Sequence, residues 1–250
     1  LTGAPADLSV LAGAVATARQ FPGVRALVVD VLPYDNAGAG DVELLAYAVA
    51  TGIEYVRALD AAGVGAAEAF GQIAFRVPAS ADQFTTIARL RALRRLWARV
   101  GEVLDVPEGE RGALQHAVTS WRMVTRDDAY VNLLRGTIAT FAGAVGGAEI
   151  VTTLPFDTAH GLPTDFSRRM ARNTQLVAAE ESNLGRVSDP AGGAWFVEAT
   201  TDQLAAKAWE LVGTIEAAGG MAQALADGTV ASEIAGVAAE RAKRLAARKQ

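Results

Sequence analysis

The sequence predicts an α/β fold in which parallel strands alternate with helices, on three observations. Short runs rich in β-branched residues alternate four times with longer runs of helical periodicity. The loops between them are short, as expected where a helix returns the chain to a parallel neighbouring strand. Of the 250 residues, 51% are hydrophobic and 20% are charged, which is enough apolar material for a sizeable core. Four such units fit a doubly wound sheet or half of a (β/α)8 TIM barrel followed by helices.

The predicted elements follow one another in a regular order. Strands are expected at residues 24–31, 72–77, 114–120 and 149–156, and helices at residues 41–61, 81–100, 128–142 and 163–181. The segment 31–40 between the first strand and its helix reads as a glycine-rich turn. The chain begins at Leu1 rather than at a methionine and runs straight into a helix-like stretch, which favours a partial barrel whose first strands belong to a longer protein.

Two of these helices show a clear apolar side. The inner side of helix 41–61 is expected to carry Leu44, Leu45, Ala48, Ile53 and Val56. The apolar stripe of helix 81–100 consists of Phe84, Ile87, Leu90, Leu93 and Trp97, and arginines cover the rest of that helix.

The sequence changes character after Gly185. A turn-rich stretch ends in a capping-box pattern, with Thr200 as the N-cap and Gln203 at the third helical position. The helix that follows should end at Gly219 and Gly220, and residues 221–230 and 231–250 predict two more helices. We therefore expect a boundary near residue 185, with a helical extension over residues 186–250.

Composition excludes several classes of function. Without cysteine the chain cannot form disulfides, thiolate metal sites or a cysteine nucleophile, and its two histidines argue against a histidine-rich metal centre. A net charge of −5 offers no basic field for nucleic acid or an anionic membrane. Because no apolar run reaches roughly 18–20 residues and no signal peptide is visible, we expect a cytoplasmic location.

The glycine-rich segment does not read as a dinucleotide-binding loop. Gly38 and Gly40 supply the first two glycines of such a motif, but the third would fall at Glu43. A carboxylate there would repel a pyrophosphate at the helix N-terminus. The glycines are better explained by a tight turn.

Neither histidine carries a recognisable catalytic motif. His116 lies within a predicted strand and reads as a core or rim residue, whereas His160 falls in a loop and should be exposed. A triad of Ser120 and His116 with Asp127 or Asp128 would lack the G-x-S-x-G context of a nucleophile elbow. The two histidines also lack metal-ligand spacing.

The segment from Arg168 to Trp195 holds too many polar groups for an ordinary amphipathic helix. Together they predict a buried polar network that pins a helix to the turn around Pro190. Its members are Arg172, Asn173, Gln175, Glu180, Glu181, Arg186 and Asp189, followed by Gly192 and Gly193.

This same segment resembles the signature of the methylmalonyl-CoA mutases. The matching residues read R-M-A-R-N-T-Q-L, E-E-S and R-V-S-D-P-A-G-G-A-W, and similarity extends over nearly the whole chain. The resemblance implies an adenosylcobalamin-dependent isomerase that interconverts methylmalonyl-CoA and succinyl-CoA. It also implies that residues 1–185 are the later half of the acyl-CoA substrate barrel and that the cobalamin-binding domain is absent.

Several positions depart from the pattern of the catalytic members. Pro33 stands where they carry a histidine that binds the thioester carbonyl, and Gln72 stands where they carry a substrate-binding arginine. His116 is kept. Val118 replaces a glutamine, Trp121 a glycine, Thr152 a histidine and Leu154 an asparagine. The chain therefore resembles the small, non-catalytic subunits, which form heterodimers with a large catalytic subunit, and we expect adenosylcobalamin to be bound outside this chain.

Two other interpretations stay open at this point. A divergent mutase could act on another acyl-CoA with a rebuilt pocket that uses His116, Tyr34 and Thr152. An unrelated TIM-barrel lyase or isomerase would share only the fold.

Overall fold

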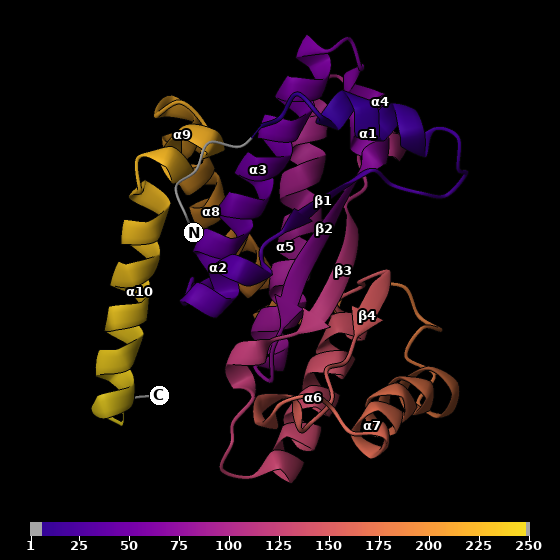
Figure 1. Ribbon diagram of the computed structural model, residues 1–250, viewed down its shortest axis with the longest axis vertical. Coiled ribbons are helices and arrows are strands. Elements are labelled where there is room, and N and C mark those ends of the chain that lie inside the picture. Colours follow the sequence, from indigo (N-terminus) through magenta and orange to yellow (C-terminus); the bar gives the residue numbers. More distant parts are fainter. Residues whose placement is uncertain (1–6, 249–250) are drawn as a thin grey trace. The chain divides into compact units, whose positions relative to one another are not determined.

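The computed structural model describes residues 7–248 and shows an α/β fold (Figure 1). Residues 1–6 and 249–250, the ends of two predicted helical stretches, lie outside the described part. The α-helices and strands are α1 (Leu11–Ala18), β1 (Leu27–Asp30), α2 (Leu32–Ala37), α3 (Asp41–Ala61), α4 (Ala66–Gln72), β2 (Ile73–Ala79), α5 (Gln83–Val103), β3 (Leu114–Thr119), α6 (Ala129–Val145), β4 (Ile150–Thr152), α7 (Asp165–Leu176), α8 (Trp195–Ala217), α9 (Met221–Ala226) and α10 (Thr229–Ala246).

The four strands form one sheet in the order β1-β2-β3-β4, as expected for successive βα units. β3 and β4 pair in parallel, with His116 opposite Ile150 and Val118 opposite Thr152. The predicted parallel sheet is confirmed, and its order fits a partial barrel. The last strand is shorter than predicted: residues 149–156 reduce to Ile150–Thr152, and the Leu154 N–H bonds the side chain of Thr119 instead of continuing the ladder.

The chain divides into two compact units, each assembled from separate segments. The first contains Leu1–Phe75, Leu93–Ala113 and Ala205–Gln250, and the second contains Arg76–Ala92 and Leu114–Leu204. Both units therefore take residues from the helix α5 and from the strand β2.

The core of the first unit is centred on Trp97, which is fully buried. Its ring stacks on Phe70 with 4.2 Å between centroids and meets the edge of Phe75 at 5.0 Å. Gly52 of α3 lies against this ring, and a Cβ at Gly52 would come within 2.6 Å of Trp97 Cζ3. The helix prediction for residues 41–61 is confirmed at both ends, and four of its five predicted inner residues are buried, Ile53 being half-buried.

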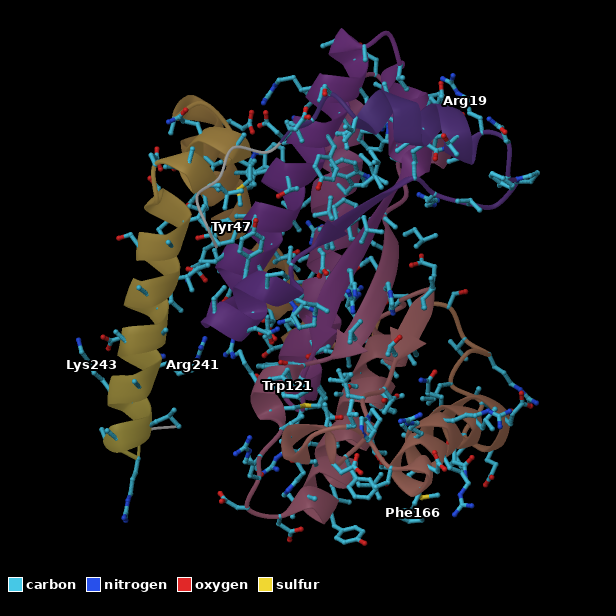
Figure 2. The ribbon with its side chains drawn as sticks, in the orientation of Figure 1. Arg19, Tyr47, Trp121, Phe166, Arg241 and Lys243 are labelled. Carbon is cyan, nitrogen blue, oxygen red and sulfur yellow. The ribbon has the colours of Figure 1, made fainter. Side chains whose placement is uncertain are left out.

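The segment predicted as a glycine-rich turn is instead the short helix α2, packed against α10. Pro33 occupies the first turn of α2, where a missing N–H costs nothing, and Gly38 ends the helix with a φ of +111°. The Arg241 guanidinium of α10 donates to the carbonyl of Gly38 at 3.0 Å. Figure 2 shows Arg241 on α10 and Tyr47 on α3. Long-range contact with α10 thus stabilises a helix that local sequence does not predict.

In the second unit, α6 approaches the sheet closely through small residues. Ala139 of α6 packs with Ala79 and Ala117 of the strands, and all three are buried. A Cβ at Gly143 would lie 3.2 Å from that of Ala117. A second cluster joins α5, α6 and α8 through Ile87, Ala142, Val145 and Val197.

Two predictions about helix residues are wrong. Phe84, assigned to the apolar stripe of α5, is 49% exposed in the first turn of the helix, where its ring makes an edge-type contact with Phe196 at 5.8 Å between centroids. Thr200 is not an N-cap: α8 begins at Trp195, and the Thr200 hydroxyl donates to the carbonyl of Phe196 at 2.7 Å. The earlier start is stabilised by Glu198, whose carboxylate accepts the Gly193 N–H at 2.8 Å.

Two further features are not predicted from the sequence. The chain forms the helix α4 before β2, and α7 passes at Val177 into one turn of π-helix that ends at Glu181. Within residues 7–248, no helix combines the length and apolar character needed to cross a membrane.

Candidate functional site

His116 and Thr152 form a cross-strand pair in the second unit. The His116 Nε2 atom lies 2.8 Å from the Thr152 hydroxyl, and both side chains are half-buried. Ala117, between His116 and Val118, packs toward α6, and alternation along the strand places His116 and Val118 on the opposite face. Because Val118 is opposite Thr152 in the register, the three side chains share this face.

Two of the predicted positions near this pair carry apolar side chains, Val118 and Leu154. Val118 is buried and offers no polar atom. Leu154 follows β4, and its backbone N–H donates to the Thr119 hydroxyl at 2.8 Å, which fixes the chain as it leaves the strand. Trp121, in the short 3-10 turn after β3, is 48% exposed (Figure 2).

The other two predicted pocket positions belong to the first unit and lie in separate elements. Pro33 is exposed at the start of α2, whereas its neighbours Tyr34 and Asp35 are buried. Gln72 is the last residue of α4, and its side-chain oxygen accepts the backbone N–H of Ala26 at 3.1 Å. Gln72 therefore links the chain entering β1 to the start of β2, which is a structural role.

The segment predicted as a buried polar network is largely exposed. Arg172, Glu180, Glu181, Arg186 and Asp189 are all exposed, and Asn173 and Gln175 are half-buried. A dense cluster of polar residues in a sequence is therefore not by itself evidence of burial. Here the side chains instead project from α7, from the following π-turn and from the loop before α8.

The turn after this segment is held by Arg91, which sequence reasoning missed. The Arg91 side chain, 12% exposed, forms a two-pronged contact with Asp189 at 3.0 and 2.9 Å and also donates to Glu198 at 2.8 Å. These hydrogen bonds raise the pKa of Arg91, the one to Glu198 most of all, against the opposing effect of burial. Gly192 is required because a Cβ there would lie 2.9 Å from the Asp189 carboxylate.

Gln175 has a specific contact with the edge of the sheet. With its amide oriented to satisfy both groups, it donates to the Val151 carbonyl at 3.0 Å and accepts the Thr153 N–H at 3.2 Å. These are the backbone groups that β4 directs away from β3, so the amide takes the place of a neighbouring strand.

Neither histidine lies in a metal cluster. His160 is exposed in a 3-10 turn, as predicted. Ser120, the serine considered for a triad with His116, instead caps the turn after β3, where its hydroxyl accepts the Arg122 N–H at 3.2 Å. Across residues 7–248, no three His, Asp or Glu side chains are grouped so that they could hold a metal ion.

Comparison with known proteins gives a consistent result. Residues 9–250 match the family model described as methylmalonyl-CoA mutase. The chain is 57% identical to the methylmalonyl-CoA mutase small subunit of Propionibacterium freudenreichii subsp. shermanii, over all of this chain and 40% of that protein. It is 53% identical to the small subunit of Streptomyces virginiae over 99% of this chain and 39% of that protein.

A wider relative is the methylmalonyl-CoA mutase of Escherichia coli, which is 39% identical over 77% of this chain and 27% of its own length. The chain thus spans about 40% of the length of the small subunits that it matches. The residues of the predicted signature lie within the matched range. The chain belongs to the methylmalonyl-CoA mutase family.

Proposed function

We propose that this chain is part of a methylmalonyl-CoA mutase small subunit, which supports a large catalytic subunit and is not itself catalytic. The names of its relatives support the subunit assignment. In this proposal the complex interconverts methylmalonyl-CoA and succinyl-CoA. Residues 1–185 contribute half of a barrel of the acyl-CoA substrate type, and residues 186–250 form its helical extension.

The main support for a non-catalytic role is that side chains without hydrogen-bond donors stand at several of the predicted pocket positions. A donor that polarises a thioester must point at the place where negative charge develops, and losing one such donor typically costs about 10²–10³ in rate. Val118 has no donor, and Pro33 lacks even a backbone N–H. His116, the histidine that remains, is hydrogen bonded to Thr152.

The chain's residues do not fit the cobalt-ligating role of a corrin-binding domain. His116 is part of a strand and contacts Thr152, and His160 is exposed in a short turn. Neither stands in a D-x-H-x-x-G sequence. We therefore infer that adenosylcobalamin in the complex is held outside this chain, and that the complex acts in the cytoplasm.

The test is co-expression with a large mutase subunit, followed by purification through a tag on this chain. The proposal predicts that the large subunit co-purifies, that the complex has mutase activity and that this chain alone has none. Activity of this chain alone would overturn the non-catalytic role and favour the divergent acyl-CoA mutase. Absence of co-purification would overturn the subunit assignment.

A further inference from the structure

A cavity of about 370 Å³ lies in the second unit, between α7 and the segment that follows β4. It is distinct from the His116–Thr152 pair, because Thr153 follows β4 and bonds Thr140 of α6, and Gln175 belongs to α7. Its lining residues are Thr153, Pro155, Arg168, Ala171, Arg172, Gln175 and Leu176.

Two arginines give this cavity its charge. Arg168 and Arg172 are four residues apart on α7 and line the same opening, and none of the lining residues is acidic. Like charges at this spacing repel each other on a helix. Both arginines are exposed, so water screens part of their mutual repulsion, and an anion bound between them would offset the rest.

The arginines also have free hydrogen-bonding capacity. A guanidinium carries five N–H donors. Arg168 uses one for the Pro163 carbonyl at 2.9 Å, which holds its side chain beside the cavity. The Arg172 side chain makes no hydrogen bond or ion pair with any residue of the described part of the chain. Guanidinium groups bind carboxylate and phosphate oxygens in pairs, so this arrangement suits an oxyanion.

The other lining groups are already satisfied or apolar. The Thr153 hydroxyl bonds that of Thr140 at 2.6 Å, and the Gln175 amide is bonded to the edge of β4. Ala171 and Leu176 add apolar surface. The ligand should therefore combine one anionic group with a short apolar part.

We propose that this cavity binds a small organic oxyanion, with its phosphate or carboxylate group on Arg168 and Arg172 and its apolar part against Ala171 and Leu176. This goes beyond the proposed function, since it assigns a ligand site away from the barrel pocket positions.

The test is isothermal titration calorimetry of the full chain with inorganic phosphate, butyl phosphate and butyrate at fixed ionic strength. The variants are Arg168→Gln and Arg172→Gln. Arg169→Gln is the matched control: Arg169 has the same charge on the same helix but lies over the Phe166 ring, 5.5 Å from its centroid, and does not line the cavity (Figure 2 labels Phe166). Circular dichroism of each variant checks that the fold is kept.

We expect saturable binding of at least one of the organic anions, weakened about tenfold or more by Arg172→Gln and Arg168→Gln and little changed by Arg169→Gln. Tighter binding of butyl phosphate than of butyrate would identify a phosphate site, and the reverse a carboxylate site. Binding of inorganic phosphate alone would overturn the role of the apolar surface. No saturable binding, or equal weakening by Arg169→Gln, would overturn the site.

Discussion

Close packing explains why a glycine stands at a helix position where composition alone gives no reason for it. Gly52 lies in the middle of α3, where an alanine would normally favour the helix. The Trp97 ring occupies the space that a Cβ would take, at 2.6 Å from Cζ3 and 2.8 Å from Cη2. The helix therefore gives up intrinsic stability so that a large aromatic ring can be buried.

Gly52→Ala should lower the free energy of unfolding by about 1–3 kcal/mol, because the added methyl group overpacks the core. Gly213→Ala is the control: Gly213 is exposed in α8 and a Cβ there would face open space, so the same change should be stabilising. Urea unfolding measures both. A Gly52→Ala protein as stable as the original would contradict the packing described here.

The hydroxyl of Thr152 should stabilise the fold through its hydrogen bond with His116. Thr152→Val keeps the shape of the side chain but removes the partner of His116 Nε2, and should cost about 1 kcal/mol of unfolding free energy. Thr152→Ser keeps the hydroxyl and should keep most of this stability. If valine and serine give equal unfolding free energies, the hydrogen bond contributes nothing.

At the scale of elements, the sequence predicts a helix well where its stability is local. Both ends of α3 are predicted correctly because Gly40 precedes two acidic residues in the first turn, Asp41 and Glu43, and an apolar periodicity follows. α2 is missed because its proline and glycines are typical of a turn, and the contact that stabilises it comes from Arg241, 203 residues away.

The same limit applies to the candidate site. The strand positions of His116, Val118 and Thr152 follow from periodicity and register, so their proximity could be predicted. The role of Arg91 could not, because in the sequence it is one of several arginines on α5 that read as solvent-facing. Its partners Asp189 and Glu198 are 98 and 107 residues away.

Arg91→Met should loosen the turn around Asp189 and the start of α8. Methionine keeps the apolar stem but removes both ion pairs, and we expect a loss of about 1–2 kcal/mol, given that the two carboxylates are partly exposed. Arg99→Met, which removes a pair exposed on both sides, serves as the control and should have no measurable effect. Hydrogen exchange should accelerate at Gly193 and in the first turn of α8 only in Arg91→Met; equal exchange in both variants would contradict this role.

The contact between Tyr47 of α3 and Glu233 of α10 should stabilise the fold less as the pH becomes alkaline. Burial raises the pKa of Tyr47 above its usual 10.0, and the hydrogen bond to Glu233 and the charge of that carboxylate raise it further. A raised pKa means that the folded form holds its proton more tightly. This contribution to stability is therefore complete below the unfolded pKa and is lost as the pH rises from there toward the folded pKa.

Urea unfolding at about pH 9 and about pH 11 tests this. The original protein should lose more stability between these two values than Tyr47→Phe, which has no proton to lose. Tyr34 and Tyr55 remain in both proteins, so their own ionisation does not affect the comparison. The same pH dependence in both proteins would show that Tyr47 is not responsible.

At the scale of the whole molecule, the described part of the chain is built around one sheet of four strands. The order β1-β2-β3-β4 gives the sheet two edges, and at one of them the Gln175 amide occupies backbone groups of β4. Arg91 and Asp189 hold the turn before α8, whereas the predicted pocket positions carry Pro33, Val118 and Leu154. The proposed non-catalytic role requires this pattern: contacts that hold the fold, and no side-chain donor at Pro33, Val118 or Leu154.

The most direct test of this claim is the mutase activity of the complex with a large subunit when His116 or Thr152 of this chain is replaced by alanine. If this chain is a support, kcat and KM should match those of the original complex, provided that the variants still co-purify with the large subunit. A fall in kcat of about a hundredfold or more in a complex that still assembles would show that these residues act in the chemistry, and would contradict the account.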